Sequence, residues 1–251
     1  MKLIKDIKYC DNCHEKQTLD LYLPENNNFS VFIYFHGGGL NSGDKKDNHI
    51  FIDDLIKKGI AVVCANYRLY PSAVFPQFIQ DAAMTVSWTK EHISEYGNCK
   101  KIFVGGSSAG GYITQMLCFD KKYLAINNID ADGIDGYFMD AGQPTSHFNV
   151  LRERGYDSRR VIVDKTAPLY YIEDGRKLPP IKILVSDHDM PNRLEQNLLL
   201  VSTLRCFGYE MNKVDLEIVE NSGHCDYLSL RDENGNSVFG EKILNFIKKW
   251  E

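Results

Sequence analysis

A serine in a glycine-rich turn is the residue of this sequence best suited to nucleophilic chemistry. The pattern Gly-x-Ser-x-Gly occurs at residues 106–110, with an apolar run before it and a helix-forming run after it. A serine on a sharp strand-to-helix turn presents its hydroxyl above the edge of the sheet. The candidate nucleophile is Ser108 and not Ser107, because starting the pattern one residue earlier would put Ala109 where the last glycine must be.

A second glycine run offers donors for the same reaction. His36 is followed by three glycines, directly after another apolar run. Acyl transfer develops negative charge on an oxygen, and glycine N–H groups can approach that oxygen because no Cβ lies in the way. Without Ser108, the run would indicate only a glycine-rich turn with a structural histidine.

A histidine and an acid near the carboxyl end complete the set. Of the seven histidines, only His224 lies in a small-residue loop after a late predicted strand and before the final helix. A base for serine titrates near neutrality and lies on a loop beside the nucleophile. An acid that fixes the tautomer of this histidine is expected after the apolar run that begins at Ile181. We favour Asp189, which has the small residue Ser186 three positions before it, and Asp187 stays open.

Together these motifs resemble those of the α/β-hydrolases. Within them, the chain is similar to esterases and lipases with a His-Gly-Gly-Gly oxyanion loop, the hormone-sensitive-lipase-like and acetyl-esterase group. The turn resembles the Gly-Asp-Ser-Ala-Gly-Gly elbow of that group, with Ser107 where aspartate is commonest. The resemblance covers the chain from about Leu19 to its carboxyl end. Further matching segments are residues 19–24 and 66–71, Phe75-Pro76, Asp81 and Trp88.

The resemblance implies an α/β fold with a mostly parallel sheet and helices on both faces, in a single domain of residues 1–251. It also implies a serine hydrolase that cleaves carboxylic esters through an acyl-enzyme, without a metal or an organic cofactor. An arylformamidase-like amidase and a hydrolase fold retained for binding stay open as alternatives. The implied catalytic residues are Ser108, His224 and Asp189, and the implied oxyanion donors are the N–H groups of Gly37, Gly38 and Ala109.

Strand and helix patterns alternate along the chain as this fold requires. Strands are predicted at residues 2–8, 17–23, 31–35, 60–65, 101–105, 134–140, 181–186 and 213–219. Helices are predicted at residues 51–58, 76–96, 109–118, 193–207 and 241–249.

Residues 143–178 fit this alternation least well. We expect them to form a small helical insertion that borders the site. Only 35 residues precede His36, and the predicted strands occupy them, so we expect no N-terminal cap. An uncapped, comparatively open site predicts a preference for esters of short acyl groups.

Composition agrees with one ordinary globular domain. The chain has 251 residues, 43% of them hydrophobic and 25% charged. A net charge of −5 without a long basic run makes nucleic acid an unfavoured partner. The chain has neither a signal-peptide pattern nor an apolar run long enough to cross a membrane, which favours a cytoplasmic protein that binds no membrane. A small-molecule ester is the expected partner, and a homodimer stays open.

The remaining motifs favour structural roles. Seven scattered cysteines indicate reduced thiols, and Cys10 and Cys13 lack the second pair that a zinc site needs. We expect Arg68 and Asp81 to form an ion pair behind the site and Trp88 to lie in the core.

Overall fold

The computed structural model describes residues 2–11, 13–47 and 49–251, and within them eight strands form one sheet. The strand order is β1-β2-β4-β3-β5-β6-β7-β8. The first two pairs, β1–β2 and β2–β4, are antiparallel, and every later pair is parallel. The strands are β1 (Lys2–Lys8), β2 (Thr18–Leu23), β3 (Asn28–Phe35), β4 (Ile60–Ala65), β5 (Asn98–Ser107), β6 (Gly136–Asp140), β7 (Ile181–His188) and β8 (Val214–Gly223).

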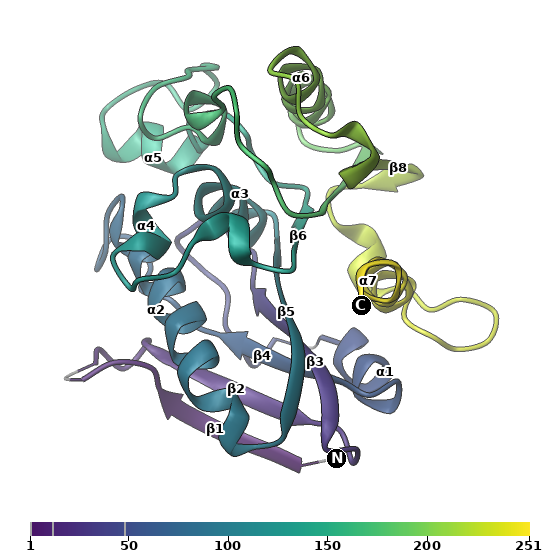
Figure 1. The fold of residues 1–251 in the computed structure, drawn as a ribbon. Coiled ribbons are helices and arrows are strands. Elements are labelled where there is room, and N and C mark those ends of the chain that lie inside the picture. Colours follow the sequence, from purple (N-terminus) through teal and green to yellow (C-terminus); the bar gives the residue numbers. More distant parts are fainter. Residues whose placement is uncertain (1, 12, 48) are drawn as a thin grey trace.

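Helices cover both faces of this sheet (Figure 1). One face carries α1 (Phe51–Lys57) and α7 (Val238–Trp250), which pack against each other. The α-helices of the other face and of the later crossovers are α2 (Gln77–His92), α3 (Ala109–Phe119), α4 (Lys122–Ala125), α5 (Phe148–Glu153) and α6 (Arg193–Cys206). The short 3₁₀ helices are η1 (Ile93–Glu95), η2 (Ala131–Gly133), η3 (Pro168–Tyr171), η4 (Met211–Lys213) and η5 (Asp226–Ser229).

Strand β3 explains why two apolar cores form. Its side chains alternate between the faces of the sheet, as a strand requires. Val31, Ile33 and Phe35 join the core beneath α2 and α3, whereas Phe32 and Tyr34 join the core beneath α1 and α7. A parallel strand covered on both faces is apolar throughout. The apolar run at residues 31–35 is therefore predicted to be buried from the sequence alone.

Glycines allow α3 to approach the sheet closely. A Cβ on Gly110 would lie 1.9 Å from the carbonyl oxygen of Phe35, and one on Gly106 would lie 2.6 Å from the backbone carbon of Gly110. No side chain fits at either distance. The first turn of α3 is therefore held against the ends of β3 and β5, and this contact positions the turn between β5 and α3.

The predicted alternation of strands and helices is confirmed, with shifted ends. The helix predicted at residues 76–96 ends at His92 and continues as η1, and the strand predicted at residues 101–105 extends to Ser107. Residues 143–178 hold only α5 and η3 as helical elements. Within the described residues, no helix is long and apolar enough to cross a bilayer.

The expectation of reduced thiols is wrong at one pair. Cys10 and Cys13 form a disulfide, with their Cα atoms 5.5 Å apart, inside the range that a disulfide spans. A spacing of three residues in the turn after β1 brings the two thiols together locally, which an argument from the scatter of the other cysteines does not capture. The remaining cysteines are free.

Candidate active site

Four loops that follow parallel strands meet at one edge of the sheet. Gly37 follows β3, Ser108 follows β5, Asp189 follows β7 and His224 follows β8. Ligands of open α/β sheets bind outside the carboxyl ends of the strands. The topology therefore brings together residues that lie as much as 187 positions apart in the chain (224 − 37).

Ser108 occupies a strained position at the start of α3. Its backbone has φ 56° and ψ −110°, an unfavourable region for a residue with a side chain. The N–H of Ser108 donates to the carbonyl oxygen of Asp140 at 2.8 Å, and its own carbonyl oxygen accepts from Tyr112 at 2.9 Å. These bonds hold the sharp turn that its Gly-x-Ser-x-Gly pattern predicts.

Ser108, His224 and Asp189 form one hydrogen-bonded chain. The Oγ of Ser108 lies 2.8 Å from Nε2 of His224, and Nδ1 of His224 lies 2.6 Å from Oδ1 of Asp189. The Asp189 side chain is fully buried, whereas the His224 side chain is 24% exposed. A buried acid that binds Nδ1 leaves Nε2 facing the serine as the proton acceptor.

Asp187, the open alternative for the acid, makes different contacts. Its carboxylate accepts from the backbone N–H groups of Asn221 at 2.8 Å and Ser222 at 3.0 Å. These bonds lower the pKa of Asp187 and fix the end of β8 just before His224. The neighbouring His188 is 72% exposed.

Two of the three predicted oxyanion donors, Gly37 and Ala109, lie beside the nucleophile, and Gly38 follows in the same loop. A Cβ on Gly37 would lie only 3.4 Å from Cβ of Ser108, so the backbone of the loop approaches the serine directly. Within the described part of the chain, no protein group accepts from the N–H of Gly37 or Gly38. The N–H of Ala109, the first residue of α3, has no intrahelical partner because the first turn of a helix lacks one. All three N–H groups are therefore available to an oxyanion.

His36 supports this loop. Its buried ring stacks on Tyr67 with centroids 4.5 Å apart, and its Nδ1 donates to the carbonyl oxygen of Gly37 at 2.7 Å. Burial lowers the pKa of His36, which favours the neutral ring. His36 thus shapes the loop and makes no contact with the serine.

Two residues that the sequence did not single out brace the far side of the loop. The side-chain amide of Asn149 donates to the carbonyl oxygen of Gly39, and Arg152 donates to Asn149 Oδ1 at 2.9 Å. Both lie on α5, inside residues 143–178. Only the tertiary fold brings α5 to this loop, so no local pattern could have revealed the contact.

A buried carboxyl lies beneath the elbow. Asp140 ends β6 beside Ser107, accepts from the hydroxyl of Tyr227, and lies 4.0 Å from Sγ of Cys225. Tyr34 donates to Oγ of Ser107 at 3.0 Å. Burial raises the pKa of Asp140 to about 7, against the opposing effect of the two hydroxyls of Ser107 and Tyr227. An acid at the last position of a predicted apolar strand was the signal that could have found it.

Arg68 and Asp81 form the expected ion pair. The guanidinium donates to the carboxylate through Nε at 2.9 Å and Nη2 at 2.7 Å, and Asp81 is fully buried. Asp81 also accepts from the side chain of Gln17 at 2.8 Å. Like the stack on Tyr67, this pair is a structural feature of the segment that follows β4.

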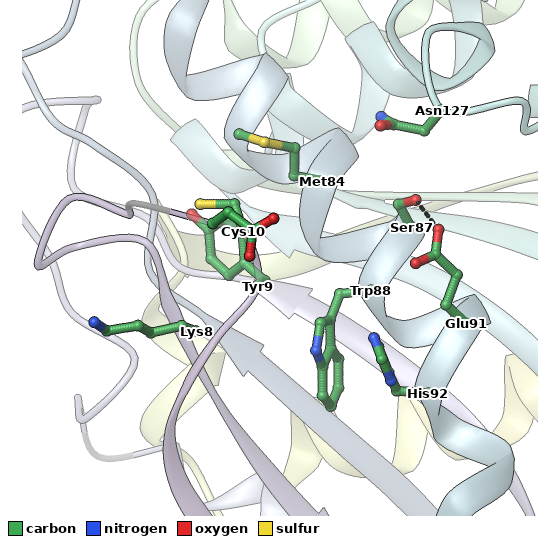
Figure 2. A pocket seen from close by; sticks show the side chains of 10 residues that line it. Lys8, Tyr9, Cys10, Met84, Ser87, Trp88, Glu91, His92 and Asn127 are labelled. Atoms are coloured by element: carbon green, nitrogen blue, oxygen red, sulfur yellow. Dashed lines mark hydrogen bonds between the residues drawn. The ribbon is translucent and has the colours of Figure 1, made fainter.

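The largest of the cavities described here, about 600 Å³, is lined by none of the predicted site residues. It lies between the end of β1 and α2, where Trp88 stacks on His92 (Figure 2). Trp88 is therefore only partly buried. It packs against the core, so the expectation that it lies within the core is met only in part.

Two other cavities are lined by residues near the candidate triad, although not by Ser108, Asp189 or His224 themselves. One of about 470 Å³ touches Gly37 and Gly38 and is bordered by Asp47, His49 and Leu228. The second, of about 240 Å³, lies on the side of Met190, the residue after Asp189. Within the described residues, no group of three or more His, Cys, Asp or Glu side chains is arranged to hold a metal ion.

The comparison with protein families agrees with this geometry. The family model described as BD-FAE matches residues 19–150, just over half of the chain. This chain belongs to the BD-FAE family. The matched region contains the glycine loop after His36, Ser108 and the ion pair of Arg68 with Asp81, whereas Asp189 and His224 lie beyond it.

Two curated relatives of this BD-FAE member are, by name, an esterase and a converting enzyme. An acetyl esterase of Salmonella schwarzengrund (strain CVM19633) is 32% identical over 119 residues, which are 45% of this chain and 36% of that protein. The chloroplastic tuliposide A-converting enzyme 2 of Tulipa gesneriana is 30% identical over 256 residues, 91% of this chain and 66% of that protein. The chain therefore spans about a third of the first relative and about two thirds of the second.

Solved structures confirm the α/β-hydrolase fold of this BD-FAE member. Esterase B of Lactobacillus rhamnosis (HN001) superposes with a TM-score of 0.79 at 18% identity, over 98% of this chain and 85% of that chain. A truncated carbohydrate esterase from gut microbiota gives 0.77 at 18% identity, over 100% of this chain and 96% of that chain. At these identities the likeness concerns the fold.

Proposed function

We propose that this chain is a serine hydrolase of carboxylic esters. The observation that carries the proposal is the chain of two hydrogen bonds, 2.8 Å and 2.6 Å long, that joins Ser108, His224 and Asp189 beside unpartnered backbone N–H groups. An acetyl esterase among the curated relatives supports the same chemistry. The domain that we infer comprises residues 1–251, with residues 143–178 bordering the site.

The proposed reaction begins with attack by Ser108 on the ester carbonyl. His224 Nε2 takes the serine proton as the C–O bond forms, and buried Asp189 stabilises the resulting imidazolium. The N–H groups of Gly37, Gly38 and Ala109 donate to the tetrahedral oxyanion. His224 then gives the proton to the leaving alcohol, and water releases the acyl group by the same steps in reverse.

The acyl group that we propose is short, in the range of acetyl to butyryl. The name of the Salmonella relative specifies an acetyl ester, and a solved esterase of Thermogutta terrifontis with a TM-score of 0.75 has butyrate bound. The polar side chains of Asp47 and His49 on the otherwise mixed border of the cavity at Gly37 and Gly38 support the same proposal for this chain.

The test compares the two neighbouring serines. Ser108→Ala is expected to lower the rate of p-nitrophenyl acetate hydrolysis by roughly 10⁴–10⁶-fold, because members of a triad act as a unit. Ser107→Ala is the matched control and should keep most of the activity, with circular dichroism verifying that both variants fold. A fluorophosphonate should label the wild type at Ser108. The proposal fails if Ser108→Ala stays active or if Ser107→Ala alone is inactive.

A further inference from the structure

Four arginines line the 240 Å³ cavity beside the triad, and no acidic residue among those described lines it. Arg152 comes from α5, Arg159 and Arg160 from the loop after it, and Arg193 from the start of α6. Several arginines around one cavity raise the positive electrostatic potential inside it. Such a cavity favours an anionic ligand.

The position of the cavity connects it to the proposed chemistry. Met190, on its border, directly follows Asp189, and Phe148, also on its border, lies 3.4 Å from where a Cβ of Gly39 would be. The cavity therefore borders the loop that carries Asp189 and, through Phe148, a side chain that packs against Gly39. From this neighbourhood we expect a substituent of an ester held at Ser108 to reach the cavity.

Three of the four arginines form no salt bridge within the described chain, although the nearby carboxylates of Asp189 and Asp140 stabilise the charge of Arg193 through space. Arg193 is only 3% exposed, yet it donates to neutral acceptors, the carbonyl oxygen of Ala141 and Oε1 of Gln143. Arg152 donates to the amide oxygen of Asn149. Arg159 is the exception, because Asp157 binds it at 2.6 Å.

The buried guanidinium is the most informative of these groups. A buried charge without an ionic partner costs free energy, so such groups persist mainly where something compensates them. The exposed Arg160 forms no salt bridge within the described residues, although its charge helps to lower the pKa of Asp157. An anion in the cavity would supply an ionic partner to Arg152 and Arg160 and would add to the carboxylates that stabilise Arg193.

We propose that this cavity binds a negatively charged oxygen group, such as a carboxylate, carried by the ester substrate. The inference rests on the proposed esterase function and adds a substrate class to it. Arginine forks bind carboxylates and phosphates through paired hydrogen bonds. The volume is below the roughly 300–1,000 Å³ of sites that enclose a whole ligand, so the cavity holds one charged substituent and not the entire substrate.

The charge can lie on either part of the ester, and two substrate pairs separate these sources. p-Nitrophenyl hydrogen succinate against p-nitrophenyl butyrate tests a charge on the acyl part. 4-Acetoxybenzoate against 4-acetoxybenzamide tests a charge on the alcohol part. The wild type is expected to prefer the anion in one of the pairs, by about tenfold in kcat/KM, and added NaCl should reduce that preference because salt screens charges near the surface.

The variant that tests the cavity is Arg160→Gln, because this side chain is exposed and unpaired. It should lower kcat/KM for the preferred anion about three- to tenfold, mainly through KM, and leave the neutral partner of the pair within about twofold. Arg205→Gln, a likewise exposed arginine at the other end of α6, is the matched control and should change neither value.

The outcomes separate this inference from the function on which it rests. Hydrolysis of the neutral esters without an anion preference would overturn the inference and leave the esterase proposal standing. A preference that Arg160→Gln leaves intact, or an equal loss for both members of a pair, would also overturn it. Failure to hydrolyse all four esters, together with no phosphonate label at Ser108, would instead remove the esterase proposal itself.

Discussion

At the scale of single residues, two carboxylates two positions apart have different environments. Asp189 is buried and binds His224, whereas Asp187 accepts from the backbone that leads to His224. The pairing of β7 with β8 shifts register between Ser186 and His188. The sequence could favour Asp189 but could not decide the choice, because a register shift depends on how the two strands pair.

These environments predict unequal effects of the same substitution. Asp189→Asn should lower kcat by roughly 10²–10⁴-fold, because an amide favours the wrong tautomer of His224. Asp187→Asn keeps a side chain of the same size and should lower kcat far less. Rates on p-nitrophenyl acetate, with thermal unfolding measured on both variants, provide the comparison. Equal small losses would mean that another residue acts as the acid.

At the scale of elements, the sequence was most informative where a strand is buried on both faces. The runs that became β3 and β4 contain continuous apolar stretches, and the run that became β7 is apolar up to Val185 except for Lys182, so their type and approximate ends could be predicted. The turn before α3 could also be predicted from its Gly-x-Ser-x-Gly pattern, and the structure shows that Gly110 leaves no space for a side chain beside Phe35. These features depend on local pattern.

Residues 143–178 show where such a prediction stops. Their two helical elements, α5 and η3, have six and four residues, too short for a helical period to appear in the sequence. The contact of Asn149 with Gly39 joins residues 110 positions apart. The insertion was recognisable by its misfit to the alternation, but its hydrogen bond to the glycine loop at Gly39 follows only from the tertiary structure.

The burial of Asp140 at the end of β6 predicts that the free energy of unfolding depends on pH. Burial raises the pKa of Asp140 to about 7, so the folded chain holds a proton that the unfolded chain loses above the ordinary value of 3.8. The contribution of this group is complete below about pH 4 and is lost as the pH rises through 7. Between these values, the wild type should lose roughly 1–4 kcal/mol of stability relative to Asp140→Asn.

Urea unfolding of both proteins at pH 4.5, 6 and 7.5 measures this difference. Comparing the two proteins cancels the carboxylates that they share, many of which are paired and act in the opposite direction. If the two stability profiles run parallel across this range, the carboxyl of Asp140 does not titrate as its burial implies.

At the scale of the whole molecule, the net charge and the local charge have opposite signs. The chain carries −5 overall, yet four arginines converge on one cavity at the candidate site. Three of them lie near one another in the sequence, at Arg152, Arg159 and Arg160. Arg193 lies on α6, more than thirty positions later. The sequence contains no long basic run. Its composition could not reveal this concentration of positive charge, because the fold brings the arginines together.

The two cavities near the candidate triad also limit the length of the acyl chain that the site favours. An apolar channel would gain about 0.8 kcal/mol for each buried methylene, roughly a fourfold rise in kcat/KM per carbon. Neither cavity is a continuous apolar channel, because Asp47 and His49 border the cavity beside Gly37 and Gly38 along with Phe51 and Leu228, and arginines border the other along with Phe148 and Met190. A lengthening chain would have to remove water from these polar groups, which offsets the apolar gain.

We therefore expect kcat/KM on p-nitrophenyl esters to level off or fall beyond about four carbons when acyl chains of two to twelve carbons are compared. A rise that continues past about eight carbons would contradict this prediction and indicate an apolar channel along residues 143–178.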